Sequence, residues 1–231
     1  MTEILLNLTA RPIPYPQEVY DRLSLEAKEI IERYPHSRSA LLPLLHLVQS
    51  VESYVSGTGI EFCAEQLGLT DAEVTAVATF YSMYRRNRTG DFHVGVCTNT
   101  LCAVMGGDQI FAEMKQHLGI KHGETTADGA VTLEHIECNA ACDFAPVVMV
   151  NWEFFDNQTP ESAKAMVDSL RRGEQVTGSR SGLPLCSFRE TARILAGFED
   201  QRPGATDGEA GPATLAGLEV AEQHSTDGGT K

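Results

Sequence analysis

In the N-terminal part of the chain, apolar side chains repeat at the three- and four-residue spacing of helices with one buried face. Pro16 suits the first position of a helix, and Gly68 suits the end of one. Thr70 and Glu73 form the sequence of a capping box. The predicted helices cover residues 16–34, 39–55, 60–67 and 70–84. Together they predict a helical bundle over residues 1–88.

After Arg85 the pattern changes to the alternation of strands interleaved with helices. The predicted elements are strands at 91–97, 131–138 and 147–151, a turn into a short fourth strand at 153–157, and helices at 102–118 and 160–170. The order β-α-β-β-α is that of a thioredoxin-like α/β domain, which we place at residues 89–175. The predicted fold class is therefore α+β, with the helical bundle preceding the α/β domain.

The periodicity is lost from Gly173 onward, and residues 176–231 form a C-terminal extension. Residues 183–198 keep apolar side chains, with a helical pattern at 187–196, and we interpret them as a docking segment for a partner. Residues 199–231 contain six glycines, no aromatic residue, and seven acidic against two basic residues. Because this composition buries too little apolar surface to order itself, we predict a mostly disordered acidic tail.

The net charge of the chain argues against one class of partner, nucleic acid. The chain has 231 residues, of which 42% are hydrophobic, and a formal net charge of -14. Because nucleic acid would repel such a chain, we expect no nucleic-acid partner. The helices at 60–67 and 70–84 resemble a DNA-binding helix-turn-helix in outline, and the negative charge favours ordinary core packing instead.

The sequence has no basic N-terminal segment followed by a long apolar run, and it has no stretch of 18 apolar residues. We therefore expect neither a signal peptide nor a direct membrane span. The expected location is the reducing cytoplasm, where structural disulfides are rare, although peripheral attachment to a membrane complex stays compatible with this sequence.

Four cysteines in two pairs are the most specific chemical signal. Cys97 and Cys102 have four residues between them, and Cys138 and Cys142 have three. Both pairs follow predicted strands, where ligand sites of α/β folds gather. Zinc fingers favour cysteine pairs with two residues between them, and plant and bacterial ferredoxins space their cysteines differently. A [2Fe–2S] cluster has two irons that each need two thiolates, so the two loops predict one such cluster per chain.

Other interpretations of these residues stay open. The same four thiolates could hold a structural zinc, because sequence does not separate metals by affinity. His93 shares a strand face with Cys97, but a Rieske site needs two histidines, and four cysteines are already available. We expect His135 to face solvent, Cys63 to be a core thiol and Cys186 to stay outside any disulfide.

The spacing also bears on redox chemistry. A thioredoxin-type Cys-x-x-Cys is absent, and so are a P-loop and a dinucleotide-binding glycine motif. Backbone N–H groups of residues 98–101 and 139–141 are available to donate hydrogen bonds to the cysteine sulfurs, which would raise the reduction potential of a cluster, whereas burial of the negative cluster would lower it. The chain is therefore predicted to carry electrons, with nicotinamide and flavin bound by a partner.

Three segments resemble the E subunit of respiratory complex I, the small thioredoxin-like [2Fe–2S] protein of its NADH-dehydrogenase module. They are GVCTNTLCAVMGG and IECNAACDFAPVVMVN at the cysteine pairs and LGLTDAEVTAVATFYSMY upstream. The resemblance covers residues 10–175. It implies a [2Fe–2S] cluster held by Cys97, Cys102, Cys138 and Cys142. It also implies a larger partner subunit that binds FMN and NADH, a neighbouring iron–sulfur subunit, and a peripheral position on the cytoplasmic side of the inner membrane.

One position departs from the family pattern, which usually has Leu-Gly after the third cysteine where this chain has Asn139-Ala140. If that glycine serves a positive φ, Ala140 must strain or shift the loop. The leading expectation is an electron-transfer subunit of NADH:quinone oxidoreductase. Its alternatives are a diaphorase subunit of an NAD-linked hydrogenase or formate dehydrogenase, and a zinc-stabilised interaction module. The N-terminal helical segment disfavours a free-standing ferredoxin.

Overall fold

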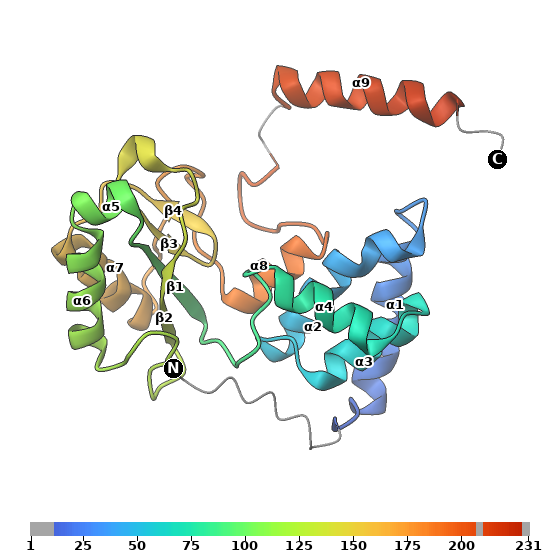
Figure 1. Cartoon of the computed structure of the whole chain (residues 1–231), viewed down its shortest axis with the longest axis horizontal. Coiled ribbons are helices and arrows are strands. Elements are labelled where there is room, and N and C mark those ends of the chain that lie inside the picture. The colour runs from blue at the N-terminus through green and yellow to red at the C-terminus, as the bar shows by residue number, and fades with distance from the viewer. Residues whose placement is uncertain (1–11, 207–209, 228–231) are drawn as a thin grey trace. The chain divides into compact units, whose positions relative to one another are not determined.

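A computed structural model describes residues 12–206 and 210–227 of the chain. The chain divides into two compact units, residues 1–199 and 200–231. The first unit contains a group of helices and a sheet with helices beside it (Figure 1). One hydrophobic core lies among the helices of the group and a second lies against the sheet. These two cores correspond to the predicted helical bundle and α/β domain.

The helical core is built around one helix that is buried on nearly every side. The elements are α1 (Gln17–Ile31), a 3-10 turn η1 (Ser37–Ala40), α2 (Leu41–Glu52), α3 (Gly57–Leu67) and α4 (Asp71–Phe80). Leu44, Leu47 and Val48 of α2 have no exposed surface, because α1, α3 and α4 pack around them. The capping box of Thr70 and Glu73 is formed at the start of α4, which confirms that prediction.

The second core lies on one face of a four-stranded sheet with the order β2-β1-β3-β4. The elements are β1 (Phe92–Cys97), α5 (Thr100–Val104), α6 (Gly107–Leu118), β2 (Val131–Ile136), a 3-10 turn η2 (Cys142–Phe144), β3 (Val148–Val150), β4 (Glu153–Phe155) and α7 (Pro160–Arg171). β1 is parallel to β2 and antiparallel to β3, and β3 and β4 form a hairpin. Both α6 and α7 contribute to this core, as the predicted thioredoxin-like order requires.

One predicted helix is two. The sequence pattern indicates a single helix over 102–118. In the structure this helix is interrupted between α5 and α6. Gly106 adopts a φ of 112°, which side chains rarely tolerate. A Cβ on Gly107 would lie 2.4 Å from the carbonyl oxygen of Cys97. The two glycines therefore allow the helix to restart directly against the end of β1.

The C-terminal extension is partly integrated into the first unit, because residues 183–198, which the sequence predicts as a docking segment for a partner, already pack within this chain. Their helix, α8 (Phe188–Leu195), packs against α2 of the same chain. Phe188 and Ala192 are each only 1% exposed. Leu185 contacts the sheet core, and residues just after α8 contact the helical core. The apolar pattern therefore reflects packing within this chain, and a boundary at residue 175 does not separate packed from unpacked structure.

The second unit contains α9 (Pro212–Asp227), where the sequence predicts disorder. The side chains described for this helix, residues 212–223, are all exposed. Its glycine-rich, acidic composition accordingly builds no buried core there. Among the described residues, no helix is both long enough and apolar enough to span a membrane.

Candidate metal centre

The parallel pairing of β1 and β2 brings the two cysteine motifs to the same edge of the sheet. Cys97 ends β1 and is aligned with Ile136, which ends β2, so Cys138 follows only two residues later. The side-chain amide of Asn99 donates a hydrogen bond of 3.2 Å to the Ile136 carbonyl. Motifs about 40 residues apart in sequence thus become neighbouring loops because parallel strands end together.

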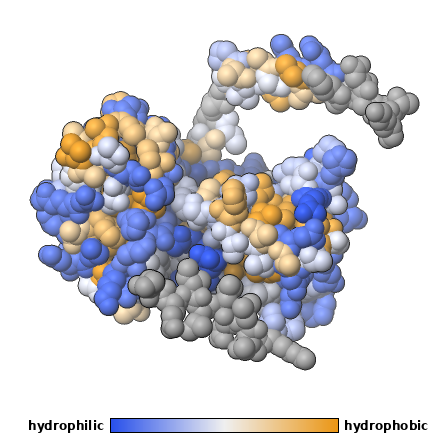
Figure 2. All heavy atoms as spheres, in the orientation of Figure 1, coloured by the Kyte–Doolittle hydropathy of each residue, from blue (hydrophilic) through white to orange (hydrophobic). Residues whose placement is uncertain are grey.

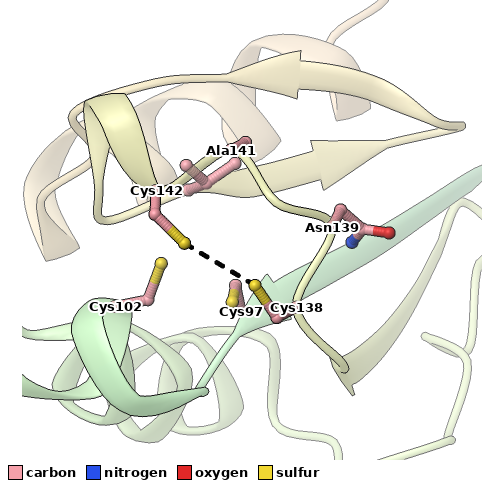
Figure 3. A pocket seen from close by; sticks show the side chains of 7 residues that line it. Cys97, Cys102, Cys138, Asn139, Ala141 and Cys142 are labelled. Carbon is pink, nitrogen blue, oxygen red and sulfur yellow. Dashed lines mark hydrogen bonds between the residues drawn. The ribbon is translucent and has the colours of Figure 1, made fainter.

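All four predicted ligand cysteines line one pocket, together with Asn139, Ala141 and Val147 (Figure 3). The Cys138 and Cys142 sulfurs are 3.6 Å apart. Two thiolates bound to one tetrahedral metal at about 2.3 Å lie about 3.8 Å from each other. The second loop therefore already has the sulfur spacing of two ligands on one metal atom.

The two pairs differ in burial. Cys97 and Cys102 are 5% and 3% exposed and belong to a small apolar cluster with Ala141 and Val147. Cys138 and Cys142 are exposed. A cofactor held by all four sulfurs would have one side packed against protein and the other near the surface.

Burial also affects the acidity of the thiols. It raises the pKa of Cys97 to about 11, although the backbone N–H of Asn99 opposes the change by hydrogen bonding to the sulfur. Hydrogen bonding with Cys138 raises the pKa of Cys142 above its usual value. These two side chains are therefore thiols at neutral pH without a metal, and metal binding must displace their protons.

Backbone amides point at sulfurs in both loops, as predicted. Besides the Asn99 contact, the Ala140 N–H donates a 3.4 Å hydrogen bond to the Cys138 sulfur. Ala140 does so with a φ of 56°, in the left-handed region that favours glycine. The positive φ expected at this position is therefore present, and an alanine adopts it where glycine would do so without strain.

Arg180 holds the second loop in place, and sequence reasoning missed it. Its guanidinium donates to Asp143, directly after Cys142, and to Asp156, directly after β4. It also stacks over the rings of Phe144 and Phe154. Because Arg180 lies in the extension predicted to be mostly disordered, no sequence pattern connected it to the cysteines.

His93 takes no part in this site. It is 1% exposed, its Nε2 lies 2.9 Å from a carboxylate oxygen of Glu134, and Arg85 binds the same carboxylate through two nitrogens. This network links β1 and β2 to the segment that follows α4. Burial lowers the pKa of His93, which favours a neutral ring. The position of His93 agrees with the sequence argument against a Rieske-type site.

The remaining candidates lie where the sequence placed them. His135 is exposed, and Cys63 is fully buried in the helical core. All six cysteines fall within the described residues, and none forms a disulfide. Within that same part of the chain, no group of three or more His, Cys, Asp or Glu side chains already converges as a single-ion site. The case for a centre therefore rests on the four thiols of one pocket.

Exposed apolar side chains lie within three residues of a cysteine in both loops. Leu101, Val104 and Met105 of the α5 segment are 44%, 80% and 56% exposed, and Phe144 of η2 is 50% exposed. Figure 2 shows hydrophobic atoms gathered on the face that carries α5. Both cysteine loops thus contribute apolar surface beside the thiols, as expected where another protein covers a site.

Four cysteines in one pocket, on loops that follow parallel strands, define the class of thioredoxin-like iron–sulfur proteins. The chain belongs to the thioredoxin-like [2Fe-2S] ferredoxin family, which it matches over residues 27–171. The E subunit of NADH-quinone oxidoreductase from Mycobacterium tuberculosis is 66% identical over 213 residues, 92% of this chain and 84% of that protein. Its counterpart in Rickettsia bellii is 40% identical over 156 residues, 66% of this chain and 93% of that protein.

A solved structure of an NAD+-reducing [NiFe]-hydrogenase in the air-oxidized state has a similar fold, with a TM-score of 0.52 and 17% sequence identity. The similarity covers 58% of this chain and 23% of that one. It supports the fold alone. The family implies a [2Fe–2S] cluster, and the donor set fits it, since four cysteine thiols line one pocket and two already have the spacing of ligands on one tetrahedral metal.

Proposed function

We propose that this chain is the E subunit of an NADH:quinone oxidoreductase and that Cys97, Cys102, Cys138 and Cys142 bind its [2Fe–2S] cluster. The observation that carries the ligand assignment is the single pocket formed by all four thiols. The 66% identity to the mycobacterial protein, over most of its length, supports the parent complex. When bound, a [2Fe–2S] cluster takes up and releases one electron at a time.

The chain's own residues would perform three tasks at this centre. The four thiolates bind, after release of their protons. The N–H groups of Asn99 and Ala140 donate to sulfurs, which stabilises negative charge and raises the reduction potential. The apolar cluster that includes Val147 excludes water on the buried side, while Cys138 and Cys142 lie on the side from which a partner can approach.

The apolar surface formed by Leu101, Val104, Met105 and Phe144 supports a partner that covers the exposed pair of cysteines. We assign that partner as the flavin subunit, which would bind FMN and NADH, with an iron–sulfur subunit as a further neighbour. The complex would place this chain on the cytoplasmic side of the inner membrane, without a span of its own. Electrons from NADH would then reach the cluster by way of the partner's flavin.

The test is to tag the chain in its native cell, purify the complex anaerobically and identify the copurifying proteins. The expected result is an FMN-containing subunit together with other subunits of a quinone reductase, and a cluster signal that appears on addition of NADH. Copurification with hydrogenase or formate dehydrogenase catalytic subunits would instead identify a diaphorase. A preparation with one zinc and no sulfide per chain would identify the non-redox module.

A further inference from the structure

We propose that Arg180 is a positioning residue for the candidate cluster: it anchors the Cys138–Cys142 loop and raises the cluster's affinity for an electron. The inference rests on the proposed cluster ligands and adds a residue outside the matched segment 27–171. It is carried by the contacts of one guanidinium with the turn after Cys142 and with the end of β4.

Arg180 joins the cysteine loop to the edge of the sheet by hydrogen bonds. Its Nη2 donates to an Asp143 carboxylate oxygen at 2.8 Å. Its Nε and Nη2 each donate to the Asp156 carboxylate at 3.0 Å. Asp143 lies in η2 directly after Cys142, and Asp156 directly follows β4. The guanidinium therefore fixes the turn that carries the fourth cysteine against a strand of the sheet.

Two aromatic rings flank the same guanidinium. Its central carbon lies 5.7 Å from the Phe144 ring centre and 4.9 Å from that of Phe154. Phe154 also packs against the small apolar cluster that contains Cys97 and Cys102. Arg180 thus connects the exposed loop to the apolar cluster below the buried thiols.

The backbone around Arg180 is itself held against β4. The Ser179 N–H and hydroxyl both donate to the Phe154 carbonyl at 2.8 Å, and the same hydroxyl accepts from the Asp156 N–H at 2.9 Å. An antiparallel bridge between Thr177 and Pro184 closes the segment into a hairpin. This hairpin gives Arg180 a defined position next to η2.

The charge of Arg180 matters as well as its shape. Asp143, directly after Cys142, is 56% exposed, and its carboxylate accepts a 2.8 Å hydrogen bond from the Arg180 guanidinium, so the two opposite charges lie together beside this cysteine. Reduction adds one negative charge to a cluster that is already negative. A guanidinium that offsets Asp143 makes this addition more favourable. Removal of the positive charge therefore lowers the reduction potential, whereas a lysine retains the charge and loses the planar fork.

The experiment compares Arg180→Gln and Arg180→Lys with the wild type and with Arg171→Gln in anaerobically purified full-length chain. Arg171 is the matched control, because it pairs with Asp128 at 2.7 Å with similar exposure and lies on α7. One readout is the one-electron midpoint potential, measured by EPR-monitored dithionite titration. The other is the rate at which a chelator removes the cluster.

For Arg180→Gln we expect the reduction equilibrium to shift about threefold toward the oxidised form, which is about 30 mV for one electron. We also expect severalfold faster loss of the cluster. Arg180→Lys should keep the wild-type potential within about 10 mV, yet lose its cluster faster than wild type.

The proposal is overturned if Arg180→Gln matches the wild type in both readouts, or if Arg171→Gln changes them equally. If Arg180→Lys lowers the midpoint potential as much as Arg180→Gln does, the role of Arg180 is purely structural. That result also contradicts the proposed charge effect. A wild-type chain that binds no cluster would instead refute the proposed function, so the two failures are distinguishable.

Discussion

The two cysteine loops supply the same ligands by different means. In the first loop, Cys97 and Cys102 are buried, and the loop is closed by Gly106, which adopts a positive φ, and by Gly107, which leaves no room for a side chain. In the second loop, Cys138 and Cys142 are exposed, and the loop is held by side-chain contacts across the surface. Main-chain packing thus fixes one half of the site, and a surface network fixes the other.

The difference has consequences for which changes each half tolerates. A close-packed loop fails through steric overlap, because its neighbours are backbone atoms that cannot move aside. A loop held by exposed ion pairs loosens gradually, since each such contact contributes little alone. The first loop should therefore respond steeply to small changes, and the second should respond in small steps.

The largest effect should come from the ligands themselves. Cys97→Ser and Cys138→Ser should each lose the cluster, because a serine hydroxyl is a far poorer iron ligand than a thiolate. Cys63→Ser, in the helical core, should retain it. Iron and sulfide per chain, measured after anaerobic purification, check all three. Equal loss in the Cys63 variant would show that the ligand assignment is wrong.

The second-largest effect should come from a substitution that tests the close packing of the first loop. Gly107→Ala places a methyl group 2.4 Å from the Cys97 carbonyl oxygen and 2.9 Å from that of Cys102. We expect a loss of about 2–3 kcal/mol in stability and a large fall in cluster content. Gly119→Ala is the control at the other end of α6, where only the positive φ is strained, and should cost about 1 kcal/mol with the cluster retained. Denaturant unfolding curves and iron analysis compare the two, and similar losses in both would contradict the steric account of the first loop.

A chemical probe compares the loops directly. In chelator-treated protein, iodoacetamide should modify Cys138 and Cys142 severalfold faster than Cys97 and Cys102, because only the former pair is exposed. Cys63, fully buried, should stay unmodified while the chain is folded. Mass spectrometry of digested protein at short reaction times gives the rates. Equal rates for the four would refute the asymmetry.

The smallest effect concerns the backbone of the second loop. Ala140→Gly should stabilise the chain by about 1 kcal/mol, since glycine adopts the observed φ of 56° without strain. Ala141→Gly is the matched control and should destabilise it, because Ala141 is buried and has a negative φ of -95°. Thermal unfolding of both variants measures the difference. A loss of stability in Ala140→Gly would show that the loop is not strained at this position.

The sequence predicted most of this site for a physical reason. The alternating apolar positions locate β1 and β2, and a cysteine lies at or just after the end of each strand. Because the two strands are parallel, their ends lie at the same edge of the sheet, and both cysteine pairs meet there. Sequence analysis missed the two features of the site that depend on contacts between residues far apart in the sequence. The break at Gly106 and Gly107 depends on packing against the Cys97 carbonyl, which periodicity does not encode. Arg180 lies in a segment of weak pattern that becomes ordered against β4.

The central claim is that the four thiols of this pocket hold one [2Fe–2S] cluster. Its most direct test is the iron, acid-labile sulfide and zinc content of anaerobically purified protein, with EPR after dithionite reduction. About two iron and two sulfide per chain and a rhombic S = 1/2 signal are predicted. One zinc without sulfide, from cells supplied with iron and handled without oxygen, would contradict the account and indicate a structural zinc site instead.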